Sequence, residues 1–203
     1  KLPEFKIAKK NGIKIAIVGA GPSGLGAAGM LAQMGYSIDL YEGQSEPGGM
    51  CNLIPEERLD KNILRTDIEF LFKLGDINFI GNKKVDDIDI LIKNYSAVII
   101  STGLDTAIKL NIPNEDKAID WMGFLRNEEK LAGKNVAIIG GGAIAVDCAI
   151  TARTRGASEI EMICLESLNE MPLTDAERKE MLDNKIDVTT RTKINEIILE
   201  NGI

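Results

Sequence analysis

The stretch IAIVGAGPSGLGAAGMLAQMGYSIDLYE, residues 15–42, decides the fold. Lys14 to Val18 is a short apolar, β-branched run that is typical of a buried strand. A glycine-rich turn follows, and then a predicted helix from Ser23 to Met34 that ends at Gly35. The next predicted strand, Ser37 to Glu42, completes a strand–turn–helix–strand unit of the kind found in parallel α/β sheets.

The turn GAGPSG, residues 19–24, has the glycine spacing of a dinucleotide-binding unit. Gly19 permits the tight turn, Gly21 lets a pyrophosphate approach the backbone, and Gly24 allows close packing of helix on strand. The helix N-terminus offers free N–H groups and a partial positive charge. Glu42, at the end of the second strand, can accept hydrogen bonds from both hydroxyls of a ribose. A turn that serves packing alone is the alternative interpretation.

The same plan restarts near residue 135. The turn GGGAIA, residues 140–145, lies between a predicted strand and a predicted helix, with Ala145 where a small residue suffices for packing. Glu166 ends the following strand, as Glu42 does in the first unit, and the packing alternative applies again. Asp147, inside the second helix, is interpreted either as a partly exposed polar residue or as a functional one.

Other segments alternate in the same way. Helices are predicted at 60–74, 121–125, 143–155 and 174–184, and strands at 77–80, 97–101, 135–139, 159–165, 187–191 and 194–199. Alternating apolar strands and helices predict an α/β protein with two Rossmann-like parallel-sheet units in tandem, at residues 1–110 and 111–203.

Composition excludes several classes of function. The 203 residues carry a net charge of -7, which does not favour binding to a phosphate backbone, so nucleic acid is not expected as a partner. Apolar runs are too short to span a bilayer, and Lys1 to Lys10 has no signal-peptide core, so we expect a cytoplasmic protein and no membrane partner. Histidine is absent, which excludes histidine acid–base catalysis.

The cysteines argue against thiol chemistry. Cys51, Cys148 and Cys164 include no CxxC pair, so neither a zinc ribbon nor a disulfide reductase centre is encoded, and no metal site is expected. These three residues cannot hold a four-cysteine iron–sulfur cluster by themselves. Hydride transfer between bound cofactors needs none of these side chains.

Beyond the two turns, the segments EPGGM (46–50), IPEERL (54–59), ISTG (100–103) and EMP (170–172) carry a resemblance. Together the chain resembles the small (β) subunit of glutamate synthase and its relatives, which include the flavin subunits of ferredoxin–NAD(P) oxidoreductases and dihydropyrimidine dehydrogenase. The resemblance covers nearly the whole chain in the right order. The four-cysteine N-terminal segment and the C-terminal FAD segment of that family are missing. We therefore expect a fragment whose FAD domain is incomplete, with a turn at Asn201-Gly202.

The resemblance implies which residues bind each cofactor. FAD would be held by Gly19, Ala20, Gly21, Pro22, Ser23, Glu42, Gly43, Gly49, Met50, Arg58, Thr102 and Gly103. Alternatives are a mere loop for Pro47-Gly48-Gly49 and a surface charge for Arg58. The nicotinamide nucleotide would be held by Gly140, Gly142, Ala143, Ile144 and Glu166.

Family members that use NADPH carry two arginines where this chain has Leu165 and Glu166, so NAD(H) is expected and NADP(H) is less favoured. The expected function is a flavin-dependent oxidoreductase module that passes electrons from a nicotinamide nucleotide through FAD to a partner subunit or iron–sulfur protein. A non-catalytic nucleotide-binding or assembly module is the alternative.

Overall fold

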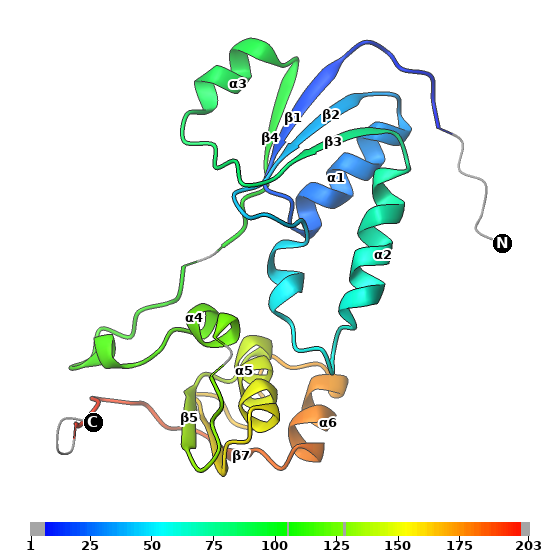
Figure 1. Ribbon diagram of the computed structural model, residues 1–203. Coiled ribbons are helices and arrows are strands. Elements are labelled where there is room, and N and C mark those ends of the chain that lie inside the picture. The colour runs from blue at the N-terminus through cyan, green and yellow to red at the C-terminus, as the bar shows by residue number, and fades with distance from the viewer. Residues whose placement is uncertain (1–6, 105, 128, 200–203) are drawn as a thin grey trace. The chain divides into compact units, whose positions relative to one another are not determined.

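The computed structural model describes residues 7–104, 106–127 and 129–199 (Figure 1). The chain divides into two compact units, Lys1–Leu104 and Asp105–Ile203. Each contains its own parallel sheet and its own helices, so the predicted tandem of Rossmann-like α/β units is confirmed. Among the described helices, none has the length and apolar character needed to cross a membrane.

The sheet of the first unit has four parallel strands in the order β3-β2-β1-β4. Their bounds are β1 Lys14–Val18, β2 Ser37–Tyr41, β3 Asp76–Ile80 and β4 Ala97–Ile100. β1 lies between β2 and β4, so the turn that follows it stands next to the ends of both neighbours. This is the place where a parallel α/β sheet binds ligands.

Helices cover both faces of this sheet (Figure 1). They are α1 Pro22–Gln33, α2 Lys61–Phe72 and α3 Ile88–Asn94, with a short 3-10 helix, η1, at Gly49–Leu53. Ile17 and Leu40 are fully buried in the core that α1 covers, whereas Ala16 and Val18 pack with Leu91 of α3. Burial on both faces explains why the central strands read as almost continuous apolar runs.

Asp39 is a buried charged residue in this otherwise apolar core. It points into the face of the sheet that α3 covers, and only 5% of its surface is exposed. Its carboxylate accepts hydrogen bonds from Tyr95 Oη at 2.5 Å and Asn78 Nδ2 at 3.0 Å, and lies 2.6 Å from Lys14 Nζ. The Tyr41 and Tyr95 hydroxyls are 2.8 Å apart in the same network. The buried charge is therefore compensated by side chains from the two neighbouring strands, β1 and β3, and from the segment after α3.

The second unit has three parallel strands in the order β5-β6-β7. They are β5 Asn135–Ile139, β6 Glu159–Ile163 and β7 Asp187–Thr189, with helices α4 Trp121–Arg126, α5 Ala143–Thr154 and α6 Asp175–Asp183 and the 3-10 helix η2 Glu115–Lys117. Val146 of α5 and Ile160 and Met162 of β6 form the centre of its core.

One sequence expectation in this unit is wrong, and one of the two interpretations of Asp147 is excluded. Residues 194–199 form no strand; one backbone bond, from Ile197 N–H to the Pro113 carbonyl at 3.1 Å, ties them to a loop instead of a sheet. Asp147 is not partly exposed, because α5 buries all but 8% of its surface. The turn expected at Asn201-Gly202 lies outside the described residues.

Candidate functional site

The first glycine turn joins β1 to α1, and two of its glycines are required by the protein itself. Gly19 has φ 104°, and a Cβ there would lie 2.3 Å from the Ser101 carbonyl oxygen. A Cβ on Gly24 would lie 1.8 Å from the Gly19 carbonyl oxygen. A side chain at either position would therefore collide with backbone, which explains both residues by turn geometry and helix–strand packing.

Gly21 is different, because none of the residues that the structure describes requires a glycine there. Its φ is -74°, which any residue adopts, and the nearest atom to a Cβ at this position would be Gly49 Cα at 4.0 Å. Gly21 is the N-cap of α1 and supplies no side-chain cap; Pro22 and Ser23, which open the helix, are exposed. The bare N-terminus is suited to an anion that approaches the backbone.

Glu42 brings a carboxylate to this turn from the end of β2. One carboxylate oxygen accepts a hydrogen bond from the Ala20 N–H at 2.8 Å, and the other accepts from the Gln44 N–H at 2.9 Å. A carboxylate has about four acceptor positions, so two stay available for ribose hydroxyls. Gly43 follows Glu42 and is exposed.

The Pro47-Gly48-Gly49 segment folds back onto the same turn. Gly48 N–H donates to the Ala20 carbonyl at 2.8 Å, and a Cβ on Gly49 would lie 2.8 Å from Gly21 Cα. Gly49 also has φ 54°, so both its conformation and its surroundings favour glycine. Met50, which follows Gly49 in η1, is exposed.

Ser101 is a residue that sequence reasoning did not include in the site. Its hydroxyl oxygen lies 2.9 Å from the Gly19 carbonyl oxygen and 3.1 Å from the Val18 carbonyl oxygen, so one proton is shared between the two acceptors and ties the end of β4 to the turn. Thr102 and Gly103 follow it and are exposed, and Gly103 has φ 76°. The sequence did indicate this segment, since Ser101 begins the Ser-Thr-Gly motif.

Arg58 belongs to the IPEERL segment, residues 54–59. It ends a turn between η1 and α2, where its backbone N–H donates to the Pro55 carbonyl at 2.9 Å. This backbone hydrogen bond is local to the turn and does not link Arg58 to a ligand site.

The second glycine turn repeats this geometry between β5 and α5. Gly140 has φ 142°, which disfavours any other residue. Gly142, the N-cap of α5, has φ -96°, and a Cβ there would meet Pro172 Cγ only at 3.9 Å. Ala143 and the exposed Ile144 open the helix, and buried Ala145 stands 3.6 Å from the Cβ position of Gly140. Gly142 therefore corresponds to Gly21, an uncrowded glycine at a bare helix N-terminus.

Glu166 stands beside this second turn. A Cβ on Gly141 would lie 3.1 Å from its Oε2 atom and 3.0 Å from Cys164 Cβ. Each unit thus places a carboxylate next to a glycine turn. Glu42 directly follows β2 and bonds to the turn, whereas Glu166, which was expected to end the strand, lies beyond the end of β6 at Ile163 and is packed against the turn. Both sets of residues fit a dinucleotide, since each offers a bare helix N-terminus for phosphate and a carboxylate for ribose.

The thiols do not extend these sites into redox chemistry of their own. Burial raises the pKa of Cys148 to about 12, with the Asp147 charge adding to the effect. Burial also raises the pKa of Cys164. Cys51 is half-buried, and all three cysteines are free. Buried thiols with raised pKa values are poor nucleophiles.

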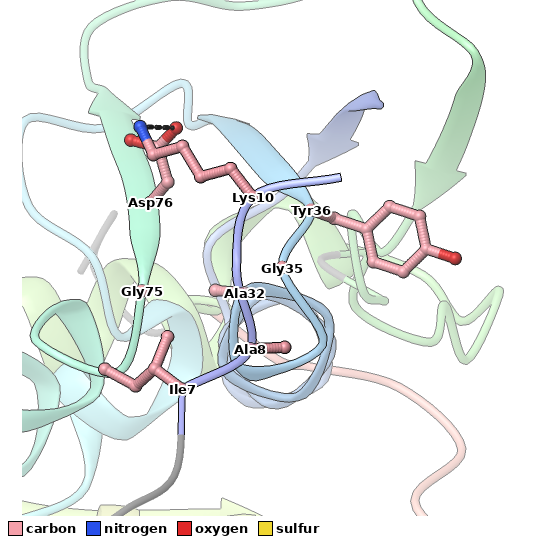
Figure 2. Close-up of a pocket in the computed structure, with 8 residues that line it drawn as sticks. All are labelled: Ile7, Ala8, Lys10, Ala32, Gly35, Tyr36, Gly75 and Asp76. Carbon is pink, nitrogen blue, oxygen red and sulfur yellow. Dashed lines mark ion pairs between the residues drawn. The ribbon is translucent and has the colours of Figure 1, made fainter. Parts of the chain in front are cut away.

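A hollow of about 190 Å³ in the first unit lies away from the glycine turn. Figure 2 shows Ile7, Ala8 and Lys10 passing over Gly35 at the end of α1 and over Asp76. Gly35 precedes β2 and Asp76 begins β3, so the hollow is at the edge of the sheet where strands start. It is smaller than the roughly 300 Å³ that ligand sites usually need.

Comparison with known proteins agrees with this geometry. The family model described as "Pyridine nucleotide-disulphide oxidoreductase" matches residues 13–202. The β subunit of an NADP(+)-dependent formate dehydrogenase from Moorella thermoacetica is 40% identical over 181 residues, which are 83% of this chain and 26% of that protein. The glutamate synthase [NADH] of Schizosaccharomyces pombe is 32% identical over 193 residues, 84% of this chain and 9% of that protein.

Among solved structures, thioredoxin reductase from T. acidophilum superposes with a TM-score of 0.65 at 22% identity, covering 92% of this chain and 66% of that one. That likeness concerns the fold alone. The chain spans about a quarter of the formate dehydrogenase subunit and less of the glutamate synthase. The expected resemblance to glutamate synthase and its relatives is confirmed.

Proposed function

Because the chain belongs to the pyridine nucleotide-disulphide oxidoreductase family, whose members are NAD(P)-linked flavoproteins, we propose that it is an oxidoreductase module that uses FAD and a nicotinamide nucleotide. The observation that carries the proposal is the pair of uncrowded glycines, Gly21 and Gly142. Each caps a helix at its N-terminus, neither is required by the fold, and each has a carboxylate nearby.

The first unit, Lys1–Leu104, is the FAD domain in this proposal. Gly19, Ala20, Gly21, Pro22 and Ser23 form the pyrophosphate-binding turn, and Glu42 with Gly43 receives the adenosine ribose. The support is that more segments converge on this turn than on the second one. Gly49 packs on Gly21, and Ser101 bonds to Gly19, so Met50, Thr102 and Gly103 are carried to the same sheet edge. Arg58 is assigned to FAD by the family resemblance alone.

The second unit, Asp105–Ile203, binds the nicotinamide nucleotide in this proposal. Gly140, Gly142, Ala143 and Ile144 cradle its pyrophosphate, and Glu166 accepts hydrogen bonds from the ribose hydroxyls. The relatives' names include both an NADP(+)-dependent and an NADH-dependent enzyme, so the choice rests on the residues of this chain. A 2′-phosphate beside Glu166 would meet like charge, which supports a preference for NADH by roughly tenfold or more.

The bound cofactors supply the hydride transfer, and the protein's contribution is to bind and orient them. The chain contains no histidine, and its two buried cysteines have raised pKa values, so neither histidine acid–base catalysis nor catalysis by these two thiols is part of the proposal. Electrons then pass to a partner subunit or an iron–sulfur protein. Support for a partner comes from the formate dehydrogenase relative, which is itself named as a subunit.

The test is a visible spectrum of the purified protein with FAD, recorded anaerobically before and after addition of NADH. Loss of the oxidised flavin absorbance on NADH addition is the expected result. A protein that binds NADH but takes up no FAD, or whose flavin stays oxidised, would overturn the proposal. That outcome would favour the non-catalytic nucleotide-binding module instead.

A further inference from the structure

An ion pair beside the second glycine turn bears on nucleotide specificity. Arg191 Nη2 lies 2.8 Å from Glu170 Oε2, and the Arg191 backbone N–H donates to the Glu166 carbonyl at 3.2 Å. Arg191 follows β7, whereas Glu166 follows β6, so two neighbouring strands deliver a cation and an anion to one place. Glu170 lies on the loop after β6.

This loop is held against the glycine turn at two points. Glu166 approaches the Cβ position of Gly141 at 3.1 Å, and Pro172 Cγ approaches that of Gly142 at 3.9 Å. The Arg178 guanidinium fixes the loop from α6, donating to the Met171 carbonyl at 2.7 Å and also to the Leu168 carbonyl. Residues 167–171 are therefore a short fixed arch next to the proposed ribose position.

Within the arch, the Glu170 carboxylate is already engaged. Its Oε2 atom accepts hydrogen bonds from the Ser167 N–H at 3.1 Å and the Ser167 hydroxyl at 2.9 Å, in addition to the pair with Arg191. The Ser167 backbone and hydroxyl hydrogen bonds, with Arg191 adding to them, hold the pKa of this carboxyl below its ordinary value. Glu170 is thus a charged, oriented partner for Arg191 at neutral pH.

We propose that Glu170 is a specificity-determining residue, because it engages the guanidinium that the 2′-phosphate of NADPH would need. The inference rests on the proposed nucleotide site in the second unit and adds a second residue to Glu166. Glu166 disfavours the 2′-phosphate directly by its like charge. Glu170 keeps the Arg191 guanidinium in an ion pair, so that Arg191 is not available to bind the 2′-phosphate with two hydrogen bonds. Arg191 is 64% exposed at its side chain, so it has room to turn toward a ligand.

The experiment is a calorimetric titration of the full chain with NADH and with NADPH at matched ionic strength. Glu170→Gln removes the charge but keeps an acceptor for Ser167. NADPH is expected to bind this variant about tenfold more tightly than it binds the wild type, with NADH affinity unchanged. The double variant Glu170→Gln/Arg191→Gln is expected to lose that gain.

A matched control is Glu129→Gln, which breaks the Glu129–Lys134 pair. That pair is 2.7 Å long and its glutamate is 55% exposed, as Glu170 is, but Lys134 precedes β5 and so lies at the opposite end of that strand from the glycine turn. It should change neither affinity. Melting temperatures show that each variant is folded.

The outcomes separate this inference from the function on which it rests. If the wild type binds neither nucleotide, the proposed function of the second unit fails and the inference fails with it. If the wild type binds NADH and Glu170→Gln brings no gain for NADPH, only the role of Glu170 is overturned. A gain that persists in the double variant would overturn the role of Arg191.

Discussion

The backbone N–H of Ala20 donates a hydrogen bond to the Glu42 carboxylate at 2.8 Å, which fastens the acid at the end of β2 to the middle of the first glycine turn. The Gln44 N–H holds the other carboxylate oxygen at 2.9 Å. The acid therefore stands in position before any ligand arrives. Such preorganisation lowers the cost of ordering a site on binding.

Replacing Glu42 should weaken FAD binding. Glu42→Gln exchanges a charged acceptor for an amide that can accept with only one of its two terminal atoms, so ribose bonds of about 1.5–3 kcal/mol are weakened. We expect the FAD dissociation constant to rise by about tenfold in a flavin fluorescence titration. Glu46→Gln, at an exposed position of the same loop, is the control and should change nothing. Equal affinities for both variants would remove Glu42 from the site.

Adding one methyl group at Gly21 should separate ligand binding from folding. Its φ of -74° suits alanine, and the nearest atom to the new Cβ is 4.0 Å away, so Gly21→Ala should keep the wild-type melting temperature. The methyl would occupy the surface that a pyrophosphate approaches, and FAD affinity should fall at least about tenfold. Melting curves and FAD titrations measure the two effects.

Alanine substitutions at two other glycines of α1 serve as controls for the Gly21 variant. Gly26 is exposed, and Gly26→Ala should leave FAD binding intact while stabilising the helix by up to about 1 kcal/mol. Gly24→Ala would bring a Cβ to 1.8 Å from the Gly19 carbonyl oxygen and should impair folding. An unchanged FAD affinity in Gly21→Ala would mean that its missing side chain serves no ligand.

Sequence reasoning succeeded where one local pattern determines the structure. A β-branched run, a glycine turn and a short helix depend on neighbouring residues, so β1, α1 and α2 were all predictable. Asp60, for example, caps α2 by accepting a hydrogen bond from the backbone N–H of Asn62, two residues away. It missed α3, a seven-residue helix whose start depends on an Asp87 cap in a charged segment.

It failed where partners distant in sequence decide the outcome. The apolar residues of 194–199 resemble a strand, but a strand forms only where a neighbour pairs with it along its length, and Ile198 remains 72% exposed. Ser101 belongs to the site because β4 pairs with β1, which brings it to Gly19. The Ser-Thr-Gly motif marks the segment, but the contact itself depends on this strand pairing.

The buried charge of Asp39 should make the first unit sensitive to acid. Burial opposes its ionisation, but hydrogen bonds from Lys14, Tyr95 and Asn78 outweigh that effect and hold the pKa below its ordinary 3.8. A carboxyl with a depressed pKa in the folded state contributes stability above pH 3.8 that is lost as the pH falls through the folded-state pKa. Stability should therefore decline below about pH 4.

Asp39→Asn tests this assignment. At pH 7 it should lower the free energy of unfolding by about 2 kcal/mol, the scale of hydrogen bonds to a charged group. The difference between variant and wild type should shrink as the pH falls below 3.8, because the wild-type carboxyl then becomes neutral as well. Urea unfolding at several pH values measures it. A difference that stays constant down to the lowest pH would show that the charge is not what matters.

The second unit offers the reciprocal of the Gly21 experiment. Gly142 has φ -96°, and a Cβ there would come no closer than 3.9 Å to Pro172 Cγ, so Gly142→Ala should fold normally. Its methyl would lie at the N-terminus of α5, where the nicotinamide nucleotide's pyrophosphate is proposed to bind. NADH affinity should fall at least about tenfold while FAD affinity stays at the wild-type value.

The two variants together assign one cofactor to each unit. Gly21→Ala should lose FAD and keep NADH, and Gly142→Ala should do the reverse, because the two turns belong to separate compact units with separate cores. Titrating both variants with both ligands gives four dissociation constants from one set of preparations. If both substitutions weakened the same ligand, the division of cofactors between the units would be wrong, even if the chain is a flavoprotein. If the losses were exchanged, the FAD and nicotinamide assignments would have to be reversed.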